Sequence, residues 1–286
     1  MADSGQNMRM TAINVADKDL AGQVIRHYQD LPGLRVGLIS GSVARGIADK
    51  SSDLDLYLYW DHANRDSLCL VNRLQPLGTD RLVSLVTPTG VFEKHRLGQR
   101  MIDVESVDVA TINNVVNWLG GDQAMTSLIE KTVSGLIDGV AIVGQDELEE
   151  WKQRIRYTDA LARAQVVAHV GGLLPPVILY SLTLARGDAV SFFARTSDVL
   201  LHSVALVAAA NRSFIAISEP KWLHWQLGRM PHVPPKMTER MNAGLLHPSL
   251  EAMGDLDLLL HEVLDLVETH VPEADTSVGR FILAMG

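Results

Sequence analysis

Two carboxylates separated by one apolar residue form the clearest chemical pattern in the sequence. Asp53 and Asp55 stand at positions i and i+2 of a segment, Asp53–Trp60, that alternates polar and apolar residues. Because side chains alternate across a strand, both carboxylates project from one face of the expected strand. Adjacent carboxylates repel one another unless a cation lies between them. Hard divalent cations such as Mg²⁺ prefer oxygen ligands and often join carboxylates to substrate phosphates, so the pair predicts a magnesium site.

A glycine and a serine lie upstream of this pair, with ten residues between Ser42 and Asp53. Gly41 and Ser42 follow the apolar run Val36–Ile39, where a buried strand is expected to end and a short helix to begin. Free backbone N–H groups at a helix start, together with the serine hydroxyl, bind phosphate readily. Gly41 lets the backbone approach the ligand closely. A phosphate site beside a metal-binding pair predicts a metal-nucleotide site.

Polar side chains of the intervening loop are further candidates for contacts with a nucleotide. They are Arg45, Lys50 and Ser52. Lys221, in a second loop rich in proline and tryptophan, is another candidate because it could reach the phosphates. These basic residues can also be present for reasons unrelated to a ligand. A charged side chain in a loop can simply be solvated, and the aliphatic stem of Lys221 can cover Trp222.

A third carboxylate is expected from a neighbouring strand. The segment from residue 101 to 107 again alternates, which places Asp103 and Glu105 on a single face. The pattern does not decide which of them completes the metal site. We favour Asp103, which is flanked by Ile102 and Val104, and keep Glu105 as a second ligand or a general base.

The elements that must position these residues form an α/β half, which we assign to residues 1–145. Extended segments are expected at Leu34–Ile39, Asp53–Trp60, Leu82–Val86, Gln99–Val109 and Val140–Val143. Helical periodicity covers Val24–Leu31, Ala63–Leu74, Thr111–Leu119 and Gln123–Leu136.

The remaining chain, residues 146–286, is expected to be an all-α helical bundle. Strand signals nearly vanish there, and long helices are expected at Glu147–His169, Pro176–Ala185, Val190–Asn211, Lys236–Leu245 and Ser249–His270. The apolar stretches within it, Val170–Ala185 and Val199–Ala210, are shorter than the roughly 18 to 20 residues of a membrane span, so no membrane association is expected.

Composition narrows the partners and the compartment. The 286 residues include 25 Lys and Arg against 34 Asp and Glu, a formal charge of −9. This excess of acidic residues argues against a protein that binds the phosphate backbone of nucleic acids, although a local basic groove is still possible. It mildly favours a cationic small molecule as the substrate. Cys69 is the sole cysteine, which excludes an intramolecular disulfide and a zinc-thiolate cluster. We therefore expect the protein in a reducing compartment, the cytoplasm. No Walker A or Gly-x-Ser-x-Gly motif occurs.

The segment Ile39–Leu58 resembles the signature of the DNA polymerase β-type nucleotidyltransferase superfamily. That signature is an apolar residue, Gly, then Gly or Ser, about ten residues, and Asp, an apolar residue and Asp or Glu. Arg45-Gly46 and Ser52-Asp53 are similar to small bacterial nucleotidyltransferases that adenylylate aminoglycoside and lincosamide antibiotics. The motif match covers about residues 35–110, and the likeness of the helical half is less specific.

The resemblance implies a mixed-sheet nucleotidyltransferase domain and a two-metal mechanism. Gly41 and Ser42 would hold the β- and γ-phosphates, and Asp53 and Asp55 would bridge two Mg²⁺ ions. Asp103, or Glu105 in its place, would complete the site. The implied reaction moves a nucleoside monophosphate, by preference AMP from ATP, to a hydroxyl of a small acceptor such as a cationic antibiotic.

Two other functions stay open. A toxin-like enzyme would use the same chemistry on a tRNA or a protein, for which an RNA acceptor requires a basic groove. A catalytically inactive nucleotide-binding protein could share the fold, although such a protein has little need for three converging carboxylates. A homodimer is also compatible with the sequence.

Overall fold

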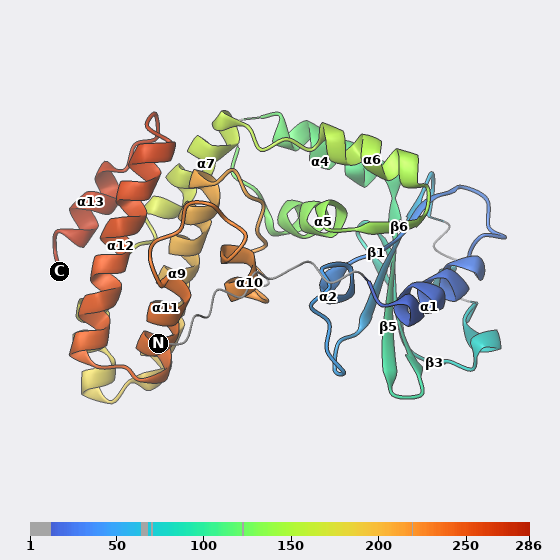
Figure 1. The fold of residues 1–286 in the computed structure, drawn as a ribbon, viewed down its shortest axis with the longest axis horizontal. Coiled ribbons are helices and arrows are strands. Elements are labelled where there is room, and N and C mark those ends of the chain that lie inside the picture. The colour runs from blue at the N-terminus through green and yellow to red at the C-terminus, as the bar shows by residue number, and fades with distance from the viewer. Residues whose placement is uncertain (1–12, 64–67, 70, 122, 219) are drawn as a thin grey trace, which may run out of the picture. The chain divides into compact units, whose positions relative to one another are not determined.

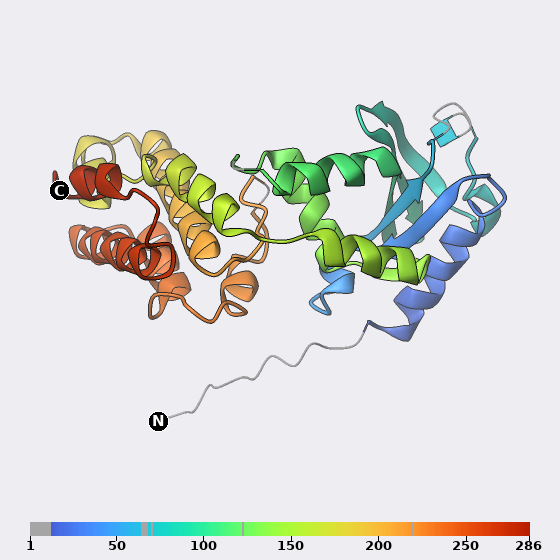
Figure 2. The ribbon, with the colours of Figure 1, turned by 90° about the horizontal axis from the view of Figure 1, so that it is seen from above.

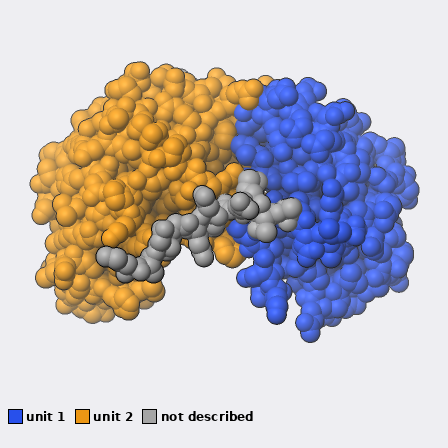
Figure 3. Space-filling view, in the orientation of Figure 1, with its two compact units in different colours: residues 1–116, 135–155 blue, residues 117–134, 156–286 orange. Residues whose placement is uncertain are grey.

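The computed structural model describes residues 13–286 except 64–67, 70, 122 and 219. These residues form two compact units, coloured separately in Figure 3. Unit 1 consists of the described residues within 1–116 and 135–155, and unit 2 of those within 117–134 and 156–286. The domain boundary expected near residue 145 stays a prediction. The expected helix Ala63–Leu74 includes positions outside the described residues and also stays a prediction.

Unit 1 is built on a six-stranded sheet in the order β3-β4-β5-β2-β1-β6. Figure 1 labels β1, β3, β5 and β6 of this sheet. The strands are β1 (Leu34–Ile39), β2 (Leu54–Trp60), β3 (Asp80–Thr87), β4 (Gly90–Leu97), β5 (Arg100–Asp108) and β6 (Val140–Val143). β2 and β5 run parallel, and all other neighbouring strands run antiparallel. The expected fold class, a mixed sheet with helices followed by a helical region, is therefore confirmed.

The two faces of the sheet differ in chemistry. Helix α1 (Val15–Arg26) contributes Val24 and Ile25 to a core that includes Leu54, Leu56 and Leu58 of β2. The other side chains of β2 point to the opposite face, which is only half-buried near the start of the strand.

Short helices follow the strands of unit 1. α2 (Gly41–Ala44) comes directly after β1, and a 3₁₀ turn, η1 (Gln75–Leu77), precedes β3. α6 (Gln145–Arg154) places Trp151 edge-on against Tyr59 near the end of β2, with ring centroids 5.3 Å apart. α4 (Val109–Leu119) and α5 (Ser127–Ile137) contain residues of both units.

Unit 2 is helical, as Figure 2 shows for the segment that follows α6. Its helices are α7 (Asp159–Val170), α8 (Pro176–Leu182), α9 (Ala189–Ala210), α10 (Leu223–Leu227), α11 (Met237–Leu246), α12 (Leu250–His270) and α13 (Ser277–Leu283), with a 3₁₀ turn η2 (Leu184–Arg186). The long helix expected from Glu147 to His169 is in fact two helices. The chain leaves α6 at Ile155, and the hydroxyl of Thr158 accepts a hydrogen bond from Leu161 N that starts α7.

Within the part of the chain that the structure describes, α9 is the one helix long and apolar enough to cross a membrane. Of the most apolar 18-residue stretch of α9, 61% is buried inside the structure. The buried residues of α9 pack with those of α7 and α12 in one apolar cluster. Core helices of water-soluble proteins meet the same length and composition criteria.

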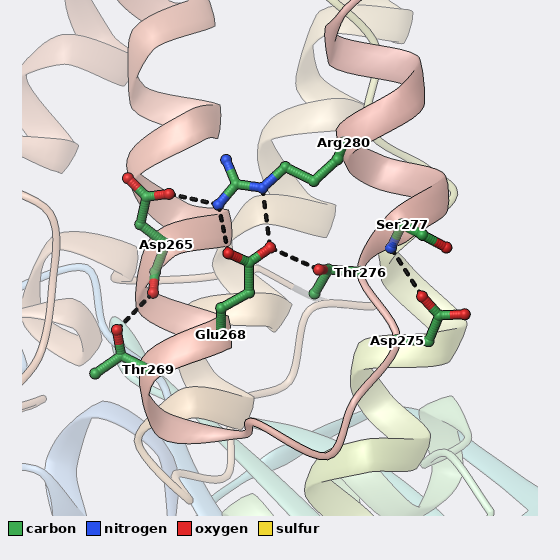
Figure 4. Close-up of polar contacts among 7 residues, drawn as sticks. All are labelled: Asp265, Glu268, Thr269, Asp275, Thr276, Ser277 and Arg280. Atoms are coloured by element: carbon green, nitrogen blue, oxygen red, sulfur yellow. Dashed lines mark hydrogen bonds and ion pairs between the residues drawn. The ribbon is translucent and has the colours of Figure 1, made fainter.

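An arginine fastens the last helix of unit 2 to α12 (Figure 4). The Arg280 guanidinium donates to Glu268 Oε1 at 2.9 Å and to Glu268 Oε2 at 2.7 Å, and it also pairs with Asp265. The hydroxyl of Thr276 donates to Glu268 Oε1 at 2.6 Å. These hydrogen bonds from Arg280 and Thr276 lower the pKa of Glu268 to about 2.

Candidate functional site

A row of charged side chains crosses three neighbouring strands of unit 1. In the sheet register Asp103 of β5 lies beside Asp55 of β2 on one side and beside Lys94 of β4 on the other. Residues paired in this way share a face of the sheet. We call Lys94, Asp103 and Asp55 the charged row.

From the sequence, Asp53 and Asp55 are predicted on one face of their strand, and Asp103 on one face of its own. The alternation of buried and half-buried residues along β2 agrees with this prediction for Asp55. Leu54 and Leu56 are buried on the α1 side, while Asp55 is half-buried on the other. Asp53 precedes β2 by one residue and reaches the charged row through Lys94, because Lys94 Nζ lies 3.3 Å from Asp53 Oδ2.

Lys94 also contacts the third predicted carboxylate. Its Nζ lies 3.1 Å from Asp103 Oδ1, an oxygen that is itself shielded from solvent. Partial burial lowers the pKa of Lys94, but hydrogen bonds and charge attraction from Asp103 and Asp53 outweigh it and raise the pKa. Lys94 is therefore held as an ammonium between two carboxylates.

The Gly-Ser turn lies directly against the row. Gly41 adopts a left-handed backbone with φ of +65°, and a Cβ at this position would lie only 2.0 Å from Asp55 Oδ2. The backbone N–H of Ser40 donates to the carbonyl oxygen of Asp55 at 2.9 Å. Ser42 is the next residue of α2 and is half-buried. The structure thus brings the predicted phosphate turn and one predicted metal ligand together.

Glu105 lies one step further along the same face. Its strand partner is Tyr57, whose hydroxyl hydrogen-bonds to the Glu105 carboxylate. Burial and the Glu105 charge raise the pKa of Tyr57 well above its usual value. The ring of Tyr57 in turn lies against Gly135 of α5. Since Lys94 joins Asp53 to Asp103, the geometry favours Asp103 over Glu105 as the third ligand, which stays a prediction.

Two of the other loop candidates are engaged with acids of unit 1. The Arg45 guanidinium donates to Asp138 Oδ2 at 2.8 Å, and both side chains are largely buried. The Ser52 hydroxyl donates to Asp49 Oδ1 at 3.1 Å and accepts from Asp49 N at 2.9 Å, which closes a turn before β2. Their predicted contacts with a nucleotide are not tested by these bonds.

The two candidate lysines belong to different units. Lys50 is exposed and lines a pocket of about 530 Å³ together with Arg100 and Asp17, which form an ion pair of 3.0 Å. Lys221 belongs to unit 2 and precedes α10, where its carbonyl oxygen accepts a hydrogen bond from Gln226 Nε2 at 2.7 Å. The pocket that Lys50 lines does not include the residues of the charged row, and the predicted nucleotide contacts of both lysines stay predictions.

Asp53 and the two aspartates of the charged row have the donor atoms that magnesium prefers, but not the spacing. Carboxylate oxygens are the ligands that Mg²⁺ prefers, and Asp53, Asp55 and Asp103 would supply them. Among the described residues, however, no three His, Cys, Asp or Glu side chains are close enough to hold a metal ion as they stand. The cation found between Asp53 and Asp103 is the ammonium of Lys94, a residue that the sequence reasoning missed.

No protein-family model matches the sequence, and no curated protein matches it either. A solved structure with similarity to this chain is a nucleotidyltransferase-like protein from Exiguobacterium sibiricum. The match covers 93% of this chain and 78% of that chain, with 14% sequence identity and a TM-score of 0.41.

Proposed function

We propose that unit 1 is a magnesium-dependent nucleotidyltransferase. In the proposed reaction a hydroxyl of a small acceptor attacks the α-phosphorus of a nucleoside triphosphate, by preference ATP. The new P–O bond forms as the bond to pyrophosphate breaks, so the acceptor gains a nucleoside monophosphate. The observation that carries the proposal is the contact of the Gly41 turn with the Asp55 carboxylate, beside Asp103 on the neighbouring strand.

Each residue has a defined role in this proposal. Backbone N–H groups near Gly41 and the Ser42 hydroxyl bind phosphate oxygens. Asp53, Asp55 and Asp103 hold Mg²⁺, which neutralises the charge of the carboxylates and the phosphates when it is bound. Glu105 is the candidate for the base that accepts the proton of the attacking hydroxyl, and its hydrogen bond with Tyr57 fixes the carboxylate in place.

A small acceptor fits the surroundings of the row better than a nucleic acid does. Two basic side chains near the Gly-Ser turn and the row are paired with acids, Arg45 with Asp138 and Lys94 with two aspartates, while Lys50 is exposed. Phosphate-backbone binding requires Lys and Arg that are available to the phosphates. The formal charge of −9 adds a mild preference for a cationic acceptor. We place the enzyme in the cytoplasm, where nucleoside triphosphates and Mg²⁺ are abundant.

The proposal is tested by incubating the protein with Mg²⁺ and each α-labelled nucleoside triphosphate. Pools of aminoglycosides, lincosamides, tRNA and the protein itself serve as acceptors. We expect label transfer to a small molecule and a loss on the order of a thousandfold in Asp55→Asn, because charge stabilisation of the transition state is removed. Asp80→Asn is the matched control, since Asp80 forms an exposed ion pair with Arg96 on the edge strand.

The outcomes separate the candidate functions. Transfer only to tRNA or protein would replace the small-molecule acceptor with the toxin-like alternative. Equal transfer by the wild-type protein and a folded Asp55→Asn variant would refute the assignment of the site. Binding of a nucleotide without transfer to any pool would favour the inactive binding protein.

A further inference from the structure

We infer that Lys94 is a tethered cation that occupies the position between Asp53 and Asp103 in the metal-free protein, and that a divalent cation must displace it. This inference rests on the proposed function, because it concerns regulation of the same carboxylates. Lys94 then sets how strongly the site takes up its metal ion.

The sheet fixes Lys94 in this position. Lys94 is paired with Asp103 in the antiparallel register of β4 and β5, and the hairpin between these strands is closed by Gly98 in a left-handed conformation. Neighbouring residues of β4 cannot replace it, because Glu93 and His95 point to the opposite face and are buried. The pairing therefore follows from the backbone and not from a chance contact of a long side chain.

Electrostatics explains why a cation is needed at this point. The side chains of Asp103 and Asp53 are only 20% and 35% exposed, and both contact the same Nζ atom. Two carboxylates brought this close without a cation would repel one another at reduced solvent screening. The ammonium supplies the charge compensation that a metal ion would otherwise supply.

The chemistry of lysine makes this compensation reversible. An ammonium is a compact charge on a flexible four-carbon stem, and it forms no bidentate fork with a carboxylate. A divalent cation offers twice the charge to the same oxygens, so it can take the position while the stem of Lys94 swings away. The cost of moving Lys94 is subtracted from the metal affinity, and removing Lys94 should increase that affinity.

The test compares Mn²⁺ binding by the wild-type protein and Lys94→Met with calorimetry, together with thermal melting in metal-free buffer. We expect Lys94→Met to bind Mn²⁺ about tenfold more tightly, because the competing charge is gone. Its metal-free form should melt at a lower temperature, and added Mn²⁺ should raise its melting temperature more than that of the wild type. Lys152→Met is the control, because Lys152 is another half-buried lysine of unit 1, and its partners, Glu149 and the carbonyl oxygen of Gly139, are not residues of the charged row.

The possible failures are distinguishable. Equal Mn²⁺ affinity in the wild type and Lys94→Met would overturn the role of Lys94 and leave the proposed function standing. Absence of Mn²⁺ binding from both would refute the metal site and the proposed function together. Should Lys94→Met fail to fold, Lys94→Gln keeps the polar contacts without the charge and is held to the same expectation.

Discussion

Each unit of this chain contains a pair of acids with one basic side chain between them, and the two basic side chains differ in kind. Unit 1 uses the ammonium of Lys94, and unit 2 uses the guanidinium of Arg280 (Figure 4). An ammonium is a point charge, whereas a guanidinium presents a planar fork that matches both oxygens of a carboxylate. We propose that the ammonium can be exchanged for another cation, whereas the guanidinium holds its carboxylates permanently, as a clamp.

The distances agree with this distinction. Arg280 contacts both oxygens of Glu268, at 2.7 and 2.9 Å, and Thr276 adds a third bond to the same carboxylate. Lys94 reaches single oxygens of its two partners at 3.1 and 3.3 Å. Short, forked contacts between two helices stabilise the fold, while the longer contacts of Lys94 to single oxygens are the ones that we propose a metal ion displaces. The comparison suggests a rule for carboxylate pairs: an arginine between them indicates a structural role, and a lysine indicates a role in binding.

The largest expected effect comes from closing the space beside the charged row. Gly41→Ala would place a Cβ 2.0 Å from Asp55 Oδ2 at a φ of +65°, so the turn or the carboxylate must move. We expect nucleotidyl transfer to fall by about a hundredfold or more, since small displacements of reacting groups cost this much. The stability loss should be about 1–3 kcal/mol, measured by urea unfolding.

The matched control for this substitution is Gly98→Ala. Gly98 has a similar φ of +60°, but nothing lies within 4 Å of the added Cβ. It should cost about 1 kcal/mol from backbone strain and leave label transfer intact. Equal losses of transfer in both variants would show that general strain, and not the contact with Asp55, explains the effect.

The second prediction converts the unit 1 pair into the kind of clamp found in unit 2. Lys94→Arg should bind Mn²⁺ about tenfold more weakly than the wild type, because a forked cation holds the two aspartates more firmly. This direction is opposite to that expected for Lys94→Met. The metal-free melting temperature should stay at or above the wild-type value. Tighter Mn²⁺ binding by Lys94→Arg would show that the lysine is not a special, displaceable cation.

The strands that carry the acids could be predicted from the sequence, whereas the strand that carries Lys94 could not. β1, β2 and β5 show apolar runs or alternation, which place Asp55 and Asp103 correctly on their faces. β4 was missed because its buried face is polar: Glu93 and His95 lie inside, so no alternation of apolar residues is visible. The hydroxyl of Tyr28 donates to Glu93 Oε2 at 2.8 Å and compensates this burial.

Pairings between distant segments are the other part that the sequence does not reveal. Arg45 pairs with Asp138, which lies 93 residues away along the chain, and the local sequence does not indicate this partner. Likewise, the Tyr57 ring meets α5 at Gly135, a contact that depends on how the helix returns to the sheet. Local periodicity predicts which face a side chain occupies, while the partner on that face follows only from the tertiary fold.

The smallest expected effect concerns the permanent clamp in unit 2 and its dependence on pH. The folded pKa of Glu268, about 2, lies below the usual value near 4.3, so this carboxylate contributes stability above about pH 4.3. The contribution is lost as the pH falls through about 2. Because the side chain is 41% exposed, solvent screening limits the contribution to roughly 1 kcal/mol.

Glu268→Gln should therefore be about 1 kcal/mol less stable than the wild type at pH 7, and the difference should shrink steadily between pH 4 and pH 2. Urea unfolding at pH 7, 4, 3 and 2 measures it, with Glu273→Gln in the exposed segment between α12 and α13 as the control. Mn²⁺ should change neither value, in contrast to the Lys94 variants. A difference that persists undiminished at pH 2 would show that Arg280 holds Glu268 by shape and hydrogen bonding to its protonated form, and the contrast between clamp and displaceable cation would then not rest on charge.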